Sequence, residues 1–149
     1  MKAAIPFFLT CAVILSLSGW LIAADKEAKT PTAVCPISGK AINKGVSIDY
    51  QGGKLYFCCP GCIAKFNADQ AKHAAKANLQ MVLTGQAKQT ACPISGEPTD
   101  PESIYKVGGV DVQFCCGKCI AKVKKAKPEE QLEMIFGKNF SKAFAVKKS

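Results

Sequence analysis

The sequence predicts a small α+β fold built from two tandem modules, each a cysteine-containing turn, a β-hairpin and a helix, with an extra helix at the C-terminus. Three observations support this prediction. Two cysteine motifs occur twice in the chain, short apolar runs flank glycine pairs between them, and apolar residues recur at helical spacing after the second motif.

An internal duplication organises the chain. Two motifs each occur twice, 57 residues apart: Cys-Pro-Ile-Ser-Gly at 35–39 and 92–96, and Phe-Cys-Cys-x-x-Cys-Ile-Ala-Lys at 57–65 and 114–122. Two shorter matches lie between them at an offset of 56: Ser-Ile at 47–48 and 103–104, and Gly-Gly at 52–53 and 108–109. We therefore expect one residue to be lost and then regained in the connecting loops of the second copy.

The duplication divides the chain into modules. We expect a linker at 25–33, the first module at 34–84, a second linker at 85–90, and the second module with its C-terminal helix at 91–149. Each copy spans about 55 residues, a size at which the core is marginal alone and disulfides, a metal ion or docking usually add stability.

The elements of the first copy follow from its turn residues and apolar spacing. Pro36 and Gly39 predict a tight turn at 35–39. Short strands are expected at 46–50 and 54–57, joined at Gly52-Gly53. A helix should begin at Pro60, and a short apolar element at 79–83 precedes a polar linker. The expected helix has an apolar and a polar face: Ile63, Phe66 and Ala74 on one side, Lys65, Asp69 and Lys72 on the other.

The second copy repeats the turn and the hairpin, with strands at 104–107 and 110–114, and its helix opens at 116–118 and runs toward Lys127. Pro128 should then start a new helix, because two glutamates in its first turn favour a helix N-terminus. This extra helix should end at Gly137 and present an apolar face, with two later aromatic residues packing back on the core: Leu132, Ile135 and Phe136, then Phe140 and Phe144.

Residues 1–24 are typical of a signal peptide. Lys2 precedes an apolar run at 5–17, and the small residues Ala23-Ala24 precede a polar stretch, so we expect cleavage near Ala24 and an exported, periplasmic or secreted protein. The alternative is an uncleaved membrane anchor, because 5–24 is about 20 residues long. Cys11 lies in the apolar run and is interpreted as a small hydrophobic residue.

The composition narrows the functional classes. The net charge is +9, with 20 basic residues, all of them lysines and spread along the chain. Dispersed lysines without arginine are typical of a solvated surface, so nucleic acid is not expected as a partner. No catalytic triad, phosphate-binding loop or carboxylate pair occurs in the sequence, and we do not expect an enzyme.

The cysteines carry the chemistry that the sequence predicts. Each copy has the spacing Cys-x22-Cys-x3-Cys, at Cys35, Cys58 and Cys62 and again at Cys92, Cys115 and Cys119. A turn cysteine facing two cysteines at a helix start places three soft sulfur ligands around one point, which suits Zn(II), Cu(I) or another thiophilic ion. The adjacent Cys59 and Cys116 are extra thiols that could add a ligand or form a disulfide.

At these residues the sequence resembles the TRASH/YHS domain family, on Cys-Pro-Ile-Ser-Gly, Tyr56-Phe57-Cys58, Cys62 and Phe66. The resemblance covers both copies and implies treble-clef-like modules associated with heavy-metal trafficking, resistance and sensing. It also implies that the six cysteines of the two Cys-x22-Cys-x3-Cys sets are the metal ligands. This chain departs from the pattern in several places. Many treble clefs have a further cysteine at the positions of Ser38 and Ser95. The second copy has Val123 where the first copy has Phe66, and Cys59 and Cys116 are additional.

Three functions stay open at this point. The first is an exported metal-binding protein, whose partners are a metal ion and a protein of the exported compartment, with a membrane involved only if the N-terminal segment is uncleaved. The second is an interaction module stapled by disulfides, since eight cysteines follow residue 24. The third is a thiol–disulfide protein that uses Cys59-x-x-Cys62 and Cys116-x-x-Cys119. His73, the single histidine, is either a fourth ligand to the first set or a solvent-facing helix residue.

Overall fold

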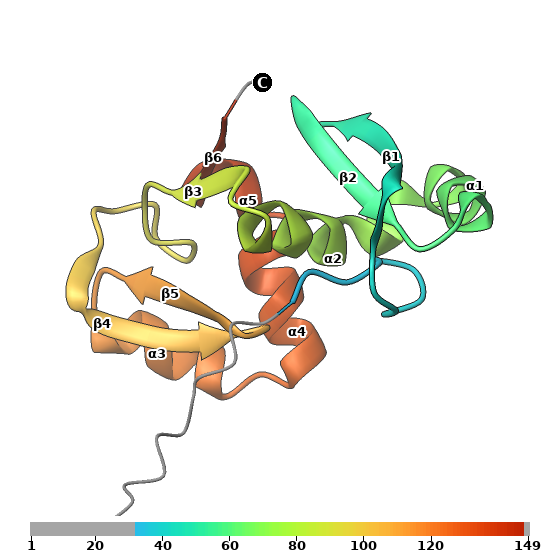
Figure 1. The fold of residues 1–149 in the computed structure, drawn as a ribbon. Coiled ribbons are helices and arrows are strands. Elements are labelled where there is room, and N and C mark those ends of the chain that lie inside the picture. Colours follow the sequence, from blue (N-terminus) through green and yellow to red (C-terminus); the bar gives the residue numbers. More distant parts are fainter. Residues whose placement is uncertain (1–31, 148–149) are drawn as a thin grey trace, which may run out of the picture.

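The computed structural model describes residues 32–147 and has the mixed α+β character that the sequence predicts. Short antiparallel hairpins alternate with helices along the chain (Figure 1). The elements, in chain order, are β1 Asn43–Tyr50, β2 Gly53–Phe57, α1 Pro60–Ala68, α2 Gln70–Leu83, β3 Ala87–Gln89, β4 Asp100–Val107, β5 Val110–Phe114, α3 Gly117–Lys124, α4 Pro128–Leu132, the π-helical turn η1 Glu133–Gly137, α5 Phe140–Ala143 and β6 Phe144–Val146. The predicted signal peptide, with Cys11 and the cleavage near Ala24, lies outside the described residues.

The two hairpins have the same register, which corrects the alignment of the two copies. In β1–β2, Ser47 is opposite Tyr56 and Asp49 is opposite Lys54. In β4–β5, the corresponding pairs are Ile104 with Gln113 and Lys106 with Asp111. All of these positions are related by an offset of 57, including the bulge near the start of each first strand. The expectation of an offset of 56, with a residue lost and regained, was therefore wrong, because strand pairing and not local sequence identity fixes the equivalence.

The turn of the first hairpin also lies one residue earlier than expected. Gln51 and Gly52 form the turn with positive φ angles of 50° and 89°, as Gly108 and Gly109 do in the second copy with 59° and 85°. Two successive positive φ angles are the requirement of a type I′ hairpin. Gly53 belongs to β2, and a Cβ there would lie 2.5 Å from Met81 Cε. Close packing on the strand therefore explains the second glycine of the first copy.

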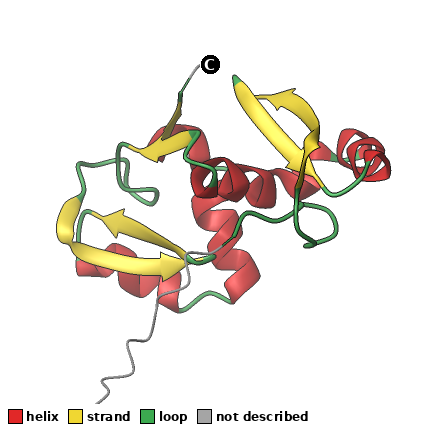
Figure 2. Cartoon of the chain, viewed as in Figure 1, coloured by secondary structure: helices red, strands yellow, loops and turns green. Residues whose placement is uncertain are grey.

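Helix α2 connects the two halves of the molecule (Figure 2). Asp69 separates it from α1 and caps it, since the Asp69 carboxylate accepts from the Lys72 N–H at 3.1 Å. The apolar run at 79–83, expected as a separate element, is the last part of this helix. Ala77 packs in the core of the first copy, whereas Met81 packs in the core of the second. No helix within 32–147 is long and apolar enough to cross a membrane.

The C-terminal segment completes the core of the second copy. Helix α4 begins at Pro128 as predicted and continues into η1, which ends at Gly137. Phe140 and Phe144 are buried and stack with ring centroids 5.1 Å apart, as expected from the sequence. The segment expected as a polar linker contains β3, which pairs antiparallel with β6. This pairing holds the C-terminal end of the described chain against the middle of the sequence.

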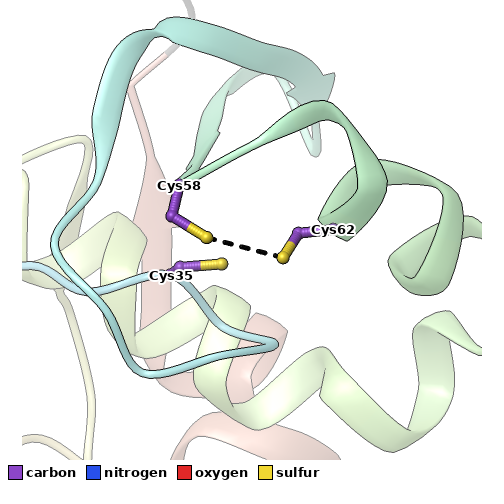
Figure 3. Close-up of side chains that lie close together, drawn as sticks. All are labelled: Cys35, Cys58 and Cys62. Carbon is purple, nitrogen blue, oxygen red and sulfur yellow. Dashed lines mark hydrogen bonds between the residues drawn. The ribbon is translucent and has the colours of Figure 1, made fainter.

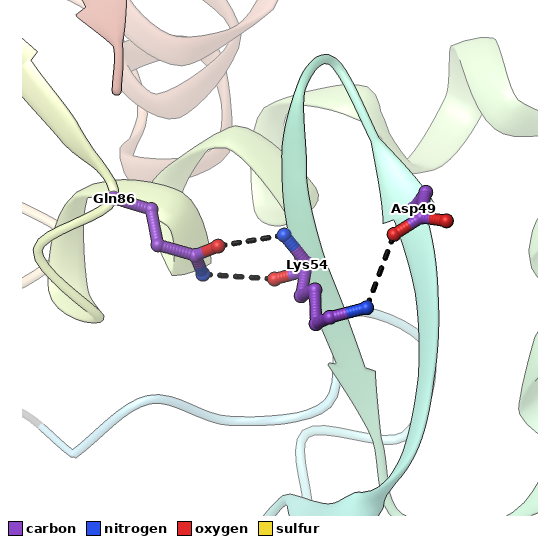
Figure 4. A network of polar contacts seen from close by, with 3 residues as sticks. All are labelled: Asp49, Lys54 and Gln86. Carbon is purple, nitrogen blue, oxygen red and sulfur yellow. Dashed lines mark hydrogen bonds and ion pairs between the residues drawn. The ribbon is translucent and has the colours of Figure 1, made fainter. Parts of the chain in front are cut away.

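Three glutamine side chains make hydrogen bonds to the backbone of the hairpin edges. The Gln80 amide accepts from the Tyr56 N–H at 2.7 Å and donates to the Tyr56 carbonyl at 2.8 Å. Gln89 makes the same two bonds to Gln113, and Gln86 makes them to Lys54 (Figure 4). Tyr56 and Gln113 are equivalent positions in the two hairpins. Each amide satisfies backbone groups that an edge strand would otherwise leave unpaired.

We expect Gln80→Leu to lower the free energy of unfolding by about 3 kcal/mol, because three hydrogen bonds to partly buried backbone groups lose their partner. Gln80 is 1 % exposed and also donates to the Val34 carbonyl at 2.8 Å, so leucine fills the space but satisfies none of the three bonds. Urea unfolding of the metal-free protein measures the change. Gln86→Leu is the matched control: its partner Lys54 is exposed, water replaces the lost bonds, and the loss should be much smaller. Equal losses for the two variants would contradict this account.

Candidate metal centres

A tight turn positions the first cysteine of each site. The Cys35 carbonyl accepts from the Gly39 N–H at 2.9 Å, and the Cys35 N–H donates to the Lys40 carbonyl at 2.8 Å. Gly39 closes the turn with a φ of +69°, a conformation that favours glycine. In the second copy the bonds of Cys92 have the same pattern, and Gly96 has a φ of +80°. Both turns therefore hold a buried thiol on a backbone that is fixed by its own hydrogen bonds.

The other cysteines lie where the second strand of each hairpin passes into a helix. Cys58 directly follows β2, Cys59 is the residue before α1, and Cys62 lies in the first turn of that helix. Cys115, Cys116 and Cys119 have the same positions between β5 and α3. The register of the hairpin fixes the end of the strand, so the strand and the helix start together carry these thiols to the turn.

In each copy the structure brings the three predicted ligands together. The Sγ atoms of Cys35, Cys58 and Cys62 all lie within 4.8 Å of one another, and so do those of Cys92, Cys115 and Cys119. Figure 3 shows the first set, with its three sulfur atoms pointing toward a common point. Cys58 and Cys62 have their Sγ atoms 3.5 Å apart, and Cys115 and Cys119 have theirs 3.6 Å apart. Sulfurs bound tetrahedrally to Zn(II) at about 2.3 Å lie about 3.8 Å from one another, so the spacing fits a metal–thiolate site.

The extra cysteines, Cys59 and Cys116, lie beside these sets. Cys59 Sγ is 3.8 Å from Cys58 Sγ and 3.5 Å from Cys62 Sγ. Cys116 Sγ is 3.6 Å from Cys115 Sγ. Cys35 and Cys92 are buried at 1 % and 0 % exposure, whereas Cys59 is exposed. All eight cysteines within 32–147 are free thiols.

Two serines lie within hydrogen-bond distance of the cysteine sulfurs, and the sequence did not identify this role. Ser38 Oγ lies 3.1 Å from Cys58 Sγ, and Ser95 Oγ lies 3.2 Å from Cys115 Sγ. Each hydroxyl also accepts a backbone N–H two residues later, from Lys40 or Glu97. The only signal in the sequence was their place in the turn, where the resemblance implies a further cysteine. They supply hydrogen bonds to the thiol set from that position.

The surroundings separate the pKa values of the turn and helix thiols. Burial raises the pKa of Cys35, but hydrogen bonds to its thiolate from Ser38 and neighbouring backbone N–H groups outweigh it, and the pKa falls to about 6. The pKa of Cys92 is lowered to about 6 for the same reason, with Ser95 in the place of Ser38. Burial and hydrogen bonds from nearby thiols raise the pKa of Cys62 and of Cys119 to about 12. Near neutral pH each set therefore contains an ionised turn thiol and a protonated helix thiol.

This ionisation pattern predicts how metal affinity changes with pH. Above pH 6 Cys35 is a thiolate before the metal binds, whereas Cys62 must lose its proton, so affinity rises with pH by about tenfold per unit for that proton. Below pH 6 Cys35 is protonated as well. Metal binding must then displace one more proton, so the affinity changes more steeply with pH. Competition with a chelator between pH 5 and pH 8 measures both slopes.

A serine variant tests the cause of the break in slope. Ser38→Ala removes the hydroxyl that lowers the pKa of Cys35, so the steeper region should extend to higher pH. Ser141→Ala, at an exposed position of α5, is the control and should leave the profile unchanged. A slope that is constant across pH 6 in the unmodified protein would contradict the assignment of an ionised turn thiol.

His73 lies apart from both cysteine sets. It is half-buried on α2 and belongs to neither group of potential ligands found among residues 32–147. The interpretation of His73 as a helix residue, and not as a fourth ligand, is the one that this position favours.

Comparisons with known proteins do not assign the chain to a family. No family model matches the chain, and neither the curated proteins nor the solved structures searched contain a match. Two cysteine triads at metal-binding distance, compatible with a bound ion, are therefore what the residues themselves establish.

Proposed function

We propose that this protein is an exported metal-binding protein that holds one thiophilic ion, Zn(II) or Cu(I) or a heavier ion, in each of its two modules. The observation that carries the proposal is the pair of equivalent cysteine triads, each with three Sγ atoms within 4.8 Å. We place the role in binding and not in catalysis, because no catalytic triad, phosphate-binding loop or carboxylate pair occurs in the sequence. Export rests on the features of residues 1–24 that are typical of a signal peptide.

The geometry of the sulfurs favours a metal over the two disulfide alternatives. A disulfide joins two sulfurs at about 2.05 Å, whereas here three sulfurs converge on one point and a fourth stands beside them. A structural disulfide or a redox-active cysteine pair uses two thiols and leaves the third cysteine of each triad without a role. Hydrogen bonds lower the pKa of the buried thiols Cys35 and Cys92 to about 6, which provides near neutral pH the thiolate form in which cysteine binds a metal.

Trafficking or resistance is the role that the exposure of the sites supports. A structural zinc site is closed, with four ligands and no open position. In this protein Cys35 is buried, but Cys58 is only half-buried and Cys59 is exposed, so one side of the first set faces solvent. The resemblance to the TRASH/YHS family points the same way.

Elemental analysis combined with thiol counting tests the proposal. The protein is purified from its own compartment without reductant, and its metal content is compared with the number of thiols that react after denaturation in a chelator. We expect two metal ions per chain and eight reactive thiols from the modules. Less than one ion per chain together with no reactive thiols would mean that the cysteines are disulfide staples, and would overturn the proposal.

A further inference from the structure

Cys59 differs from the three thiols that it adjoins. It is the exposed member of its set, while Cys35 and Cys62 are buried. It precedes Pro60, the first residue of α1, and its side chain does not cap that helix. Its Sγ is nevertheless within 3.8 Å of Cys58 Sγ and 3.5 Å of Cys62 Sγ. Cys59 therefore touches both the solvent and two predicted ligands.

The space in front of α1 is open. A Cβ placed on Gly61 would meet no atom within 4 Å, and the same holds for Gly117 at the start of α3. Cys59, two residues before Gly61, is itself exposed, so a carrier that presents its own sulfur can reach it from solvent. The buried Cys35, by contrast, can be reached by a metal ion only after the ion has left its carrier.

Ligand exchange between thiolates needs such an arrangement. A thiophilic ion leaves a thiolate carrier most readily when a new sulfur binds before the old one departs, because the bare ion is never released into water. The attacking sulfur must be exposed, and the receiving sulfurs must be within a few ångströms of it. Cys59 meets both conditions in the first copy, and Cys116, half-buried and 3.6 Å from Cys115 Sγ, meets them less fully in the second.

We infer that Cys59, and Cys116 as its counterpart, is the exchange ligand through which a metal ion carried on thiolate sulfur passes into and out of the triad. This inference rests on the proposed metal-binding function. In the first step a bond forms between the metal and Cys59 Sγ while one bond from the metal to a carrier sulfur breaks, and the Cys59 proton passes to the departing carrier thiolate. The metal then forms bonds to the Sγ atoms of Cys58, Cys62 and Cys35, while its remaining bonds to carrier sulfur and its bond to Cys59 Sγ break. Protons still held by the triad thiols pass to the departing carrier thiolates, to Cys59, which becomes a thiol again, and to water. No oxidation state changes.

Transfer kinetics test this role separately from binding. Cd(II) is supplied to the full chain as its glutathione complex, as its complex with a Cys-x-x-Cys peptide, or as its nitrilotriacetate complex, and the cadmium content of the protein, separated from the carrier at successive times, reports transfer. We expect Cys59→Ser to slow transfer from a thiolate carrier by about tenfold, because serine supplies no thiolate. Transfer from nitrilotriacetate should stay unchanged. A loss confined to glutathione identifies a small-molecule carrier, and a loss confined to the peptide identifies a protein carrier.

Equilibrium measurements separate this inference from the proposed function. The Cys59→Ser Cys116→Ser double variant should still bind two Cd(II) ions, with Cys58→Ser as the comparison that loses one. Cys116→Ser alone should slow transfer less than Cys59→Ser does. Unchanged rates from both thiolate carriers would overturn the exchange role, and so would a double variant that binds fewer than two ions, since the two cysteines would then be permanent ligands. A wild-type chain that binds no cadmium would overturn the proposed function itself.

Discussion

Replacing Cys35 by serine should remove one of the two metal ions from each chain, and replacing Cys92 should remove the other. Each of these residues is the one ligand of its site that comes from the turn, and both are almost fully buried. Without it, the remaining thiols all come from the strand end and helix start, on one side of the ion. Native mass spectrometry of the metal-loaded protein counts the ions, and the double variant should carry none.

The same variants should lose much more stability when metal is present than when it is removed. A ligand that binds the native state at 1,000 times its dissociation constant adds about 4 kcal/mol to the free energy of unfolding. Each single variant should therefore lose about that amount in metal and much less in a chelator, where serine fills nearly the same volume as cysteine. An equal loss with and without metal would mean that Cys35 contributes only to packing in the core. Two bound ions in the Cys35→Ser variant would contradict its assignment as a ligand.

The parts of the fold that depend on neighbouring residues were predictable from the sequence. The turn at 35–39 follows from Pro36 and Gly39, the start of α4 from Pro128, and the hairpins from short apolar runs around a glycine pair. The clustering of the two cysteine triads was predictable for the same reason. Their cysteines lie at the ends of short elements whose spacing is repeated, so local structure almost suffices to bring them together.

Features that depend on contacts between distant segments were not predictable. The amides of Gln80 and Gln89 each bind a hairpin edge 24 residues away along the chain, and nothing local distinguishes them from surface glutamines. The start of α2 was expected as part of one helix from Pro60 through Ala74, and its end as a separate element at 79–83, whereas Asp69 divides α1 from α2. The buried residues of α2 face different cores at different points along its length, which hides its continuity in the sequence. The register of the hairpins also required the structure. The identical Ser-Ile and Gly-Gly pairs align at an offset of 56, but the backbone pairing follows an offset of 57.

Phe66 should be the most costly apolar residue to truncate in the first module. Its ring is fully buried and makes edge-on contacts with Tyr50 and Phe57, with centroids 5.5 Å and 5.6 Å away. We expect Phe66→Ala to lower the free energy of unfolding by about 3–5 kcal/mol, because it leaves a cavity among these rings. Urea unfolding of the metal-free protein measures this loss.

Val123 occupies the equivalent position in the second copy and provides the matched control. It is also fully buried, but the second core is filled by C-terminal residues that the first core lacks, among them Phe136 and Phe144. Val123→Ala removes two carbon atoms and should cost about 2 kcal/mol. Equal losses for the two variants would contradict this explanation of the difference between the copies.

The two truncations should also act differently on the metal centres. Phe66 lies one helical turn after Cys62 on α1, so a cavity beneath it loosens the helix start that carries Cys62 of the first site. Phe66→Ala should therefore weaken cadmium binding at one site and leave the other unchanged, while Val123→Ala should affect only the site of α3. Unfolding should nevertheless stay a single transition in both variants, because α2 contributes Ala77 to one core and Met81 to the other. Two separate transitions would mean that the modules are independent, and that the shared helix does not couple their stability.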